Sequence, residues 1–350
     1  LNASIYETLK EDYNDKYEYI LPDIIFDKNL FSNKFGNADL TSNLKIHNYD
    51  TNKFTKFLIN NIDWKYSNLN FDSGLTGNIL GKIKNVNFEA KNTDFKEDTT
   101  NEVFGAVGYL TELNLFKKNK NNFDHLLTPK LLFRYAPDFM RKETDGARLN
   151  HLNIFSLDRL NSENNFEGGL STTIGFDYEV RNDQNNKKIN LMMGQIINEK
   201  ENKDMPSSSS LDEKLSDVIG NLNYEVSQRV KFNYNFAIDQ NYQDLNYNEI
   251  GTEVNLNSFK FDLNYLQEKE HIGNQEYLKA KVDLAKITNG ILSAETKRNL
   301  VTNSAEYYNL SYEYLNDCLR AGIVYRREFY EDSELEPENS LMFKITISPF

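Results

Sequence analysis

The fold class is decided by the stretch Val230-Lys231-Phe232-Asn233-Tyr234-Asn235-Phe236-Ala237-Ile238, in which a large apolar residue occupies every second position. Successive side chains of a β-strand point to opposite faces, so a period of two predicts a strand with one apolar and one polar face. The same period recurs over residues 170–180, 250–256, 259–266 and 308–314. The sequence therefore predicts an all-β protein.

The lengths of these runs favour a membrane. Several run for about 9 to 11 residues, the length that a tilted strand needs to cross a bilayer. Strands of ordinary globular proteins are shorter, with a mode of about 5–6 residues.

Composition excludes the main competing classes. The chain has 350 residues, a mean hydropathy of −0.67 and an aromatic content of 13%. No run approaches the ~20 apolar residues of a membrane helix, and disordered chains are poor in aromatics. The net charge of −13 argues against nucleic acid as a partner.

The connections between the runs alternate in length from residue 218 onward. The short connections are 227–229, 257–258, 288–290 and 316–318, and the long ones are 240–249, 267–276, 299–306 and 330–340. Short periplasmic turns and longer extracellular loops are typical of transmembrane β-barrels.

The same alternation extends upstream, with a short turn at 181–188 and long extracellular segments at 136–169 and 198–217. We expect roughly seventeen to twenty strands of about ten residues. Residues 1–135 fit less cleanly, because Val103, Gly105, Val107 and Tyr109 do not alternate with strictly polar partners. We predict one antiparallel transmembrane β-barrel domain over residues 1–350, partial at its N-terminus.

The C-terminal segment 341–350 is predicted to be the last strand. Its apolar face consists of Leu341, Phe343, Ile345 and Ile347, and the chain stops at Phe350. A terminal strand that ends in Phe resembles the signal read by the barrel-assembly machinery; the alternative is an ordinary last strand. Pro349 lacks a ladder N–H, which suits an edge or a weakly paired seam.

Several stretches resemble the lipopolysaccharide-assembly family LptD, also called organic solvent tolerance protein. Residues 153–160, with Arg159, precede Glu167-Gly168 and then Gly175 before an aromatic strand, and together they are similar to the family's mid-barrel signature. Further resemblances lie at 19–24, 312–321, 327–330 and 335–337 and in the final strand.

The resemblance implies a large outer-membrane barrel that lacks, in these 350 residues, the periplasmic jellyroll domain and the first strands. It implies insertion of lipopolysaccharide into the outer leaflet, with lateral release through a seam between the first and last strands. The implied partners are lipopolysaccharide, a plug lipoprotein inside the barrel, the periplasmic bridge proteins and the barrel-assembly machinery.

The single cysteine, Cys318, lies in a predicted short periplasmic turn. The periplasm is oxidising, so a thiol there favours pairing with a cysteine outside this chain. The family ties its periplasmic domain to the barrel through such cysteines, and the resemblance therefore implies an interdomain disulfide at Cys318. An unpaired thiol is the alternative.

No motif indicates an enzyme, a metal site or a cofactor. The histidines His47, His125, His151 and His271 lack metal-ligand spacing. Glu163 and Glu167 near Arg159 are a candidate catalytic pair, but we favour a solvated or lumen-facing ion pair.

The predicted topology places two further polar sets. The acidic run 331–336 lies in a predicted extracellular loop, where we favour a solvated loop over a divalent-cation site. Polar inward residues are expected to line a hydrated lumen, among them Lys231, Asn233, Asn255 and Asn264.

Two alternative functions stay open at this point. A general porin or nutrient-receptor barrel in the outer membrane would show the same strand pattern. A soluble β-sandwich that binds glycan would not need detergent to stay folded.

Overall fold

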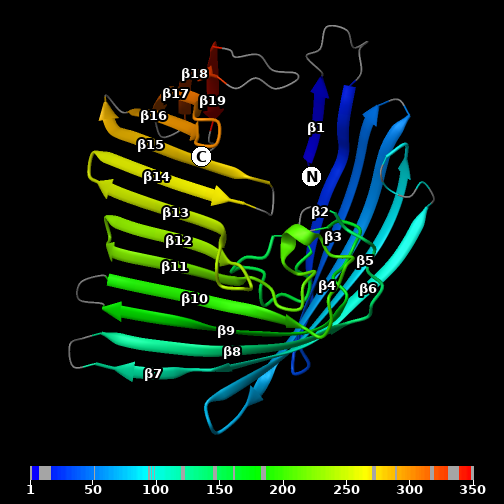
Figure 1. Cartoon of the computed structure of the whole chain (residues 1–350). Coiled ribbons are helices and arrows are strands. Elements are labelled where there is room, and N and C mark those ends of the chain that lie inside the picture. Colours follow the sequence, from blue (N-terminus) through cyan, green and yellow to red (C-terminus); the bar gives the residue numbers. More distant parts are fainter. Residues whose placement is uncertain are drawn as a thin grey trace. The chain divides into compact units, whose positions relative to one another are not determined.

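The computed structural model consists almost wholly of β-strands (Figure 1). It describes residues 2–7, 17–50, 52–93, 95, 97, 99–119, 123–144, 148–160, 162–182, 187–269, 273–287, 290–315, 319–329 and 339–347. In this part of the chain no helix is long and apolar enough to cross a membrane.

The described residues form nineteen strands in one sheet, within the predicted range. The first ten are β1 (Asn2–Glu7), β2 (Tyr17–Asn33), β3 (Gly36–Asp50), β4 (Lys53–Asn70), β5 (Leu75–Lys91), β6 (Thr100–Leu113), β7 (Leu115–Lys118), β8 (Asp124–Ala136), β9 (Gly169–Asn182) and β10 (Lys187–Asn198). The others are β11 (Val218–Ser227), β12 (Val230–Ile238), β13 (Leu245–Leu256), β14 (Phe259–Glu268), β15 (Gln275–Ile287), β16 (Gly290–Asn299), β17 (Ser304–Leu315), β18 (Leu319–Glu328) and β19 (Asn339–Ile347). A short 3-10 turn, η1, covers Ser207–Ser209.

The chain divides into two compact units. The first unit comprises Leu1–Asn114, Thr128–Gly175 and Gln195–Ser216, and the second comprises Leu115–Leu127, Phe176–Gly194 and Asp217–Phe350.

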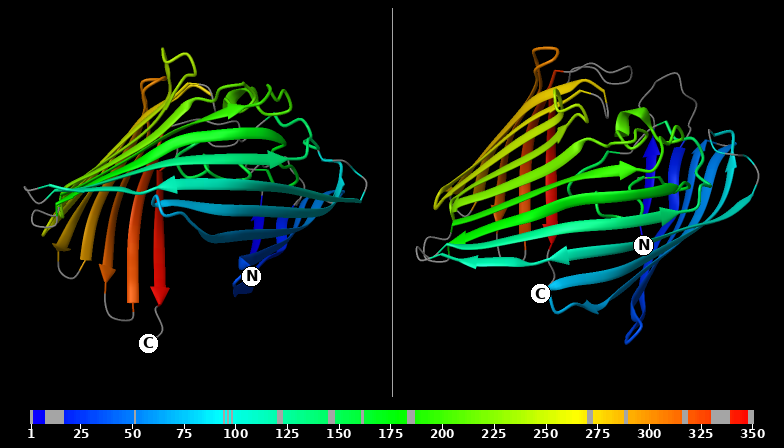
Figure 2. Two further views of the ribbon diagram at one scale, coloured as in Figure 1. Left: turned by 90° about the horizontal axis from the view of Figure 1, so that it is seen from below. Right: turned by 60° about the horizontal axis from the view of Figure 1, so that its bottom comes forward.

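The second unit confirms the period-two prediction. The stretch that opened the argument is β12, which pairs antiparallel with β11 and β13. Antiparallel pairing then continues strand by strand from β13 to β19, and Figure 2 shows these strands side by side in both views.

The two faces of the second unit differ in chemistry as predicted. Phe232, Ile250 and Ile323 lie on the apolar face, which we call the outward face, and are 42%, 44% and 45% exposed. Lys231 and Asn233 lie on the opposite, inward face, with charged and amide residues on the neighbouring strands. Exposed apolar side chains on one face and polar ones on the other are typical of a sheet between lipid and water.

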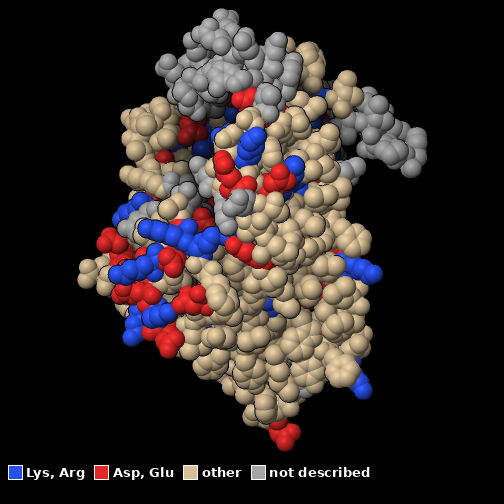
Figure 3. Space-filling view, turned by 90° about the vertical axis from the view of Figure 1, so that its right-hand side faces the viewer, with Lys and Arg blue, Asp and Glu red and all other residues tan. Residues whose placement is uncertain are grey.

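The first unit differs, because its long strands carry apolar side chains on both faces. Ile62 and Ile83 pair in register on one face of β4 and β5, which we call the outward face of the first unit. Phe57 and Phe88 pair on the opposite face, where both are buried in the hydrophobic core of this unit. Figure 3 shows a face of the protein on which a broad area carries few charged side chains.

This arrangement explains why the sequence of residues 100–113 shows no clear period of two. On β6, Val103 and Val107 are exposed on the outward face, whereas Phe104 and Ala106 are buried on the inward face. Both faces of the strand are apolar there, so the sequence shows no alternation although the backbone is a regular strand.

Polar side chains form a row across the outward face of β3 to β6, which we call the asparagine row (Ser42, Asn60, Asn85 and Asn101). Ser42 donates a hydrogen bond to Asn60, and the Asn60 and Asn85 amides each donate to the next member over 3.2 Å. On the side toward the β5–β6 connection lies the exposed ion pair Lys56–Glu89.

The alternation of connection lengths is also confirmed where strand bounds define it. Residues 228–229 and 257–258 form short turns, whereas 239–244, 269–274 and 329–338 form longer connections. Two connections are exceptions at the end where longer ones occur. Only residues 51–52 separate β3 from β4, and the connection predicted as long at 299–306 comprises only residues 300–303.

A lysine at an outward position is expected to destabilise the sheet far more than a lysine at the next residue. Ile323→Lys would place a charge in lipid and lower the free energy of unfolding by about 2–4 kcal/mol, because Ile323 lies in the middle of a spanning strand. Val324→Lys would place the same side chain on the polar face and is the matched control. Urea unfolding in lipid vesicles measures both, and equal losses would contradict the assignment of faces.

Candidate functional site

In the first unit, the described residues of two long connections fold into ordered structure. We call them the β8–β9 segment (residues 137–168) and the β10–β11 segment (residues 199–217). The sequence predicted both as long connections, but it did not predict that they pack as a core. Their buried apolar side chains are Met140, Leu149, Ile154, Leu157, Leu160, Phe166, Met205 and Leu211.

Apolar contacts hold the β8–β9 segment against the inward face of β6. The Phe166 ring stacks on the Phe104 ring with centroids 6.1 Å apart. Leu157 sits over Gly108, where an added Cβ would come within 2.6 Å of the Leu157 Cδ2 atom. A glycine is therefore needed at residue 108 for this close approach.

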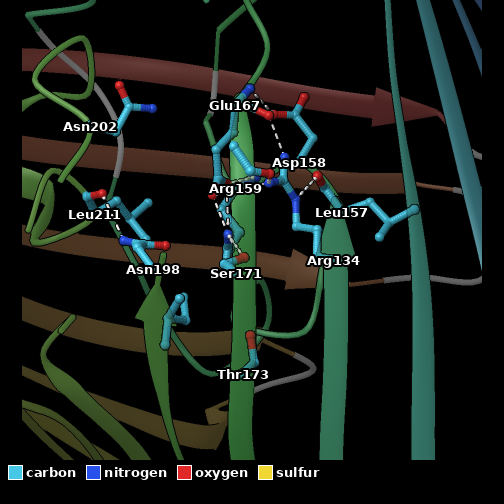
Figure 4. A network of polar contacts seen from close by, with 12 residues as sticks. Arg134, Leu157, Asp158, Arg159, Glu167, Ser171, Thr173, Asn198, Asn202 and Leu211 are labelled. Atoms are coloured by element: carbon cyan, nitrogen blue, oxygen red, sulfur yellow. Dashed lines mark hydrogen bonds and ion pairs between the residues drawn. The ribbon is translucent and has the colours of Figure 1, made fainter. Parts of the chain in front are cut away.

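A buried ion pair links Arg159 to Glu167 near the C-terminal end of this segment (Figure 4). Arg159 Nε donates to Glu167 Oε2 over 2.7 Å, and Arg159 Nη2 donates to the other carboxylate oxygen. The same Nη2 donates to Ser171 Oγ over 3.0 Å, which ties the pair to β9. The side chains of Arg159 and Glu167 are 0% and 5% exposed.

A second arginine, Arg134 at the end of β8, binds the backbone of the same segment. Its Nε donates to the Leu157 carbonyl over 2.6 Å, and its Nη2 donates to the Glu167 carbonyl. Its Nη1 lies 3.7 Å from the Glu167 carboxylate. One buried carboxylate thus faces two buried guanidinium groups.

These charges set the protonation of the buried carboxyls. Burial alone would raise the pKa of Glu167, but Arg134 and Arg159 outweigh it, and the pKa is lowered. The pKa of Asp158 is raised because burial dominates there, although Lys84 lies 3.8 Å from the carboxylate and opposes the shift. Glu167 therefore stays ionised as the counter-ion of the arginines.

The β10–β11 segment covers the β8–β9 segment. The Glu143 N–H donates to the Asp204 carbonyl over 2.8 Å, and Lys200 pairs with Asp138 at 2.6 Å. The hydrogen bond to Asp138 raises the pKa of the exposed Lys200. The two segments therefore form one ordered body within the first unit.

The residues expected to form a signature are partly brought together. Arg159 and Glu167 form an ion pair, but it is buried, whereas the sequence favours a solvated or lumen-facing pair. Gly168 packs against Pro137 and Asp138, where an added Cβ would meet oxygens at 3.2 Å. Glu163 instead pairs with Lys45 on the surface, at 3.2 Å, and Gly175 lies further along β9.

Sequence reasoning missed Arg134 and Lys84. Lys84 Nζ donates to the Asn165 carbonyl over 2.9 Å and to the Ser162 carbonyl. The sequence did hold one signal: a charged residue at an inward position of a strand, next to apolar inward residues. Such a charge requires a partner from elsewhere in the chain.

The inward face of the second unit carries a second polar feature. A cleft of about 810 Å³ is lined by Asn223, Lys231, Asn233, Asn264 and Lys279, among others. Asparagine amides cross this face in a lattice, with Asn233 donating to Asn223 over 2.6 Å. The expected polar inward face is confirmed for Lys231, Asn233 and Asn264.

Several predicted features lie outside the described residues. These are Cys318, His271, the acidic run 331–336, Pro349 and Phe350. Among the described residues no group of three or more His, Cys, Asp or Glu side chains could hold a metal ion.

Comparison with known families decides the identity. A family model for LptD, LPS transport system D, matches residues 1–313. The chain belongs to the LptD family. The match confirms the resemblance seen in the residues, and it ends before β18 and β19. LptD is a family of transport and assembly barrels rather than of enzymes, and this LptD chain is an outer-membrane β-barrel protein of lipopolysaccharide transport.

Solved structures add remote likenesses only. A mutant of the Rh. blastica porin is 10% identical, with a TM-score of 0.35 over 79% of this chain and 86% of the porin. The siderophore receptor PirA from Acinetobacter baumannii is 6% identical, with a TM-score of 0.49 over 95% of this chain and 64% of the receptor. No curated protein gives a significant match to this LptD chain.

Neutralising Glu167 is expected to release the β8–β9 segment. Glu167→Gln leaves two buried arginines without their carboxylate, and losing one partner of a buried pair costs about 3–5 kcal/mol. Hydrogen exchange of peptides from residues 137–168 measures the loss of protection. The control is Glu163→Gln, whose exposed pair with Lys45 is worth about 1 kcal/mol or less. Equal protection in the two variants would contradict the assigned role.

Acid is expected to release the same segment below about pH 4. Because the pKa of folded Glu167 is lowered, its contribution is complete above the unfolded value of about 4.3 and is lost as pH falls through the folded pKa. The raised pKa of Asp158 acts in the opposite sense, since its contribution is lost as pH rises. Hydrogen exchange corrected for intrinsic rates measures the transition. A loss of protection centred above pH ~4.3 would argue against Glu167 as the cause.

Proposed function

We propose that this LptD chain inserts lipopolysaccharide into the outer leaflet by lateral release through a seam between the first and last strands. The observation that carries the proposal is the family match together with a sheet that is apolar on one face and polar on the other. Lipopolysaccharide is amphipathic, so its sugars need the polar face while its acyl chains need lipid. Only at an unpaired strand edge can one molecule reach both the polar face of the sheet and the lipid on its apolar face.

The last strand supports a seam by its exposed edge residues. Leu341, Phe343 and Ile345 lie on the outward face of β19 and are 60%, 72% and 70% exposed. β19 pairs with β18 through Asn339 to Ile347. Opening ladder hydrogen bonds in hydrocarbon costs several kcal/mol for each group left unpaired. Pro349 would donate no hydrogen bond to the ladder, because proline lacks an N–H.

The proposed partners act at other parts of the chain. A plug lipoprotein would bind the polar inward face, and periplasmic bridge proteins would deliver the lipid. Cys318 would form a disulfide with a periplasmic domain, and Phe350 would be read by the barrel-assembly machinery. The β8–β9 segment supports this proposal as a fixed structure on the inward face of the first unit, where Arg159 and Arg134 hold it in place.

Depletion of the protein is expected to keep newly made lipopolysaccharide off the cell surface. A label that does not cross the outer membrane measures this delivery. Unchanged surface lipopolysaccharide with reduced uptake of small solutes would instead favour the general porin function.

The seam itself is tested by a photo-crosslinking residue at Phe343, with Ile250 on the outward face of β13 as the control position. During transport, crosslinks to lipopolysaccharide are expected at Phe343 and not at Ile250. Equal crosslinking at the two positions would overturn release at β19.

A further inference from the structure

The outward face of the second unit carries a groove over β15 and β16. Its volume is about 430 Å³, and its floor consists of Ala280, Val282, Ala294 and Thr296. These small side chains are neighbours in register, because Ala280 pairs with Thr296 and Val282 pairs with Ala294. The side chains on the outward face are therefore small over the two adjacent strands β15 and β16.

Larger side chains of β17 and β18 form one side of the groove. Leu310 pairs in register with Ala294 on one side and Tyr325 on the other, and Tyr308 pairs with Thr296. All three larger residues line the groove and are exposed. The groove is thus apolar, narrow and open toward the surroundings of the outward face.

A cation lies at one end of this groove. Arg327 pairs in register with Tyr308 and with Asn339, so it lies on the outward face next to the groove. Its guanidinium lies 4.8 Å from the Phe329 ring centroid, and the Phe329 ring contacts the Tyr308 ring edge-on at 5.2 Å. In the described part of the chain Arg327 forms no ion pair with a carboxylate.

The end that carries Arg327 adjoins the longer connections. Arg327 is the penultimate residue of β18, two residues before the connection 329–338 begins. Longer loops of transmembrane barrels lie on the extracellular side. A charge at this level of the outward face meets the headgroups of the outer leaflet, while the groove below it meets acyl chains.

We propose that this groove is a binding site for the lipid A part of lipopolysaccharide, with a phosphate on Arg327 and an acyl chain over Ala280 and Ala294. The inference rests on the proposed function, which brings lipopolysaccharide to the outer leaflet beside this face. The floor of the groove on β15 and β16 is separated from β19 by β17 and β18, whereas Arg327 lies beside Asn339 of β19. The site would receive the lipid after release rather than during passage through the seam.

The test measures lipid A retained by the purified full-length protein, by native mass spectrometry. Ala294→Trp fills the groove and Arg327→Gln removes the charge. Each is expected to lower retention about tenfold, the loss of roughly one charge-assisted contact. The controls are Ala321→Trp, on the outward face of β18 outside the groove, and Arg326→Gln, whose guanidinium lies over the Tyr307 ring on the inward face. Both controls are expected to keep retention unchanged.

Lipid chemistry separates the possible occupants. Dephosphorylated lipid A is expected to bind as weakly to the native protein as lipid A binds to Arg327→Gln. Retention of phosphatidylglycerol equal to that of lipid A, or unchanged retention in both groove variants, would overturn the site. If Ala294→Trp fails to fold, Arg327→Gln alone decides. Retention in detergent does not require transport, so a failure of the depletion experiment is distinguishable from a failure here.

Discussion

The whole structure depends on one constraint: a backbone inside a bilayer must satisfy its hydrogen bonds within the protein. The strands of this LptD chain meet that constraint through antiparallel pairing that runs without a break from β10 to β19. Once the backbone is paired, each residue has only two directions for its side chain. The low mean hydropathy follows, because half of each spanning strand faces polar surroundings.

The first unit satisfies a second demand, which is to keep charges buried inside an apolar core. Arg134, Arg159 and Glu167 are buried beside Leu157 and Phe166. Arg134 donates to the Leu157 carbonyl, and Arg159 donates to the Glu167 carboxylate. Burying ions costs free energy unless their partners are well placed. The hydrogen bonds of these side chains tie Leu157, Arg159 and Glu167 of the connection to β8 and β9.

The pattern of the sequence predicted those structural features that depend on neighbouring residues alone. The strand Val230–Ile238 could be predicted because its period of two is the direct result of one face in lipid and one in water. The strand β6 could not, because Phe104 and Ala106 are apolar only to receive the β8–β9 segment, which lies far along the sequence. Arg159 and Glu167 were indicated by family resemblance, but their burial was not. Arg134 gave no local signal, because its partners are carbonyls brought together by tertiary folding.

The asparagine row has a consequence for where the protein rests in the membrane. Ile83 and Val107 lie on one side of the row and the Lys56–Glu89 pair on the other. A sinking movement of two residues, about 6.6 Å, would carry the polar side chains of Ser42, Asn60, Asn85 and Asn101 into hydrocarbon. A rising movement would expose the apolar residues to water. The asparagine row therefore favours one depth of the first unit in the membrane. At that depth the row lies level with the lipid headgroups.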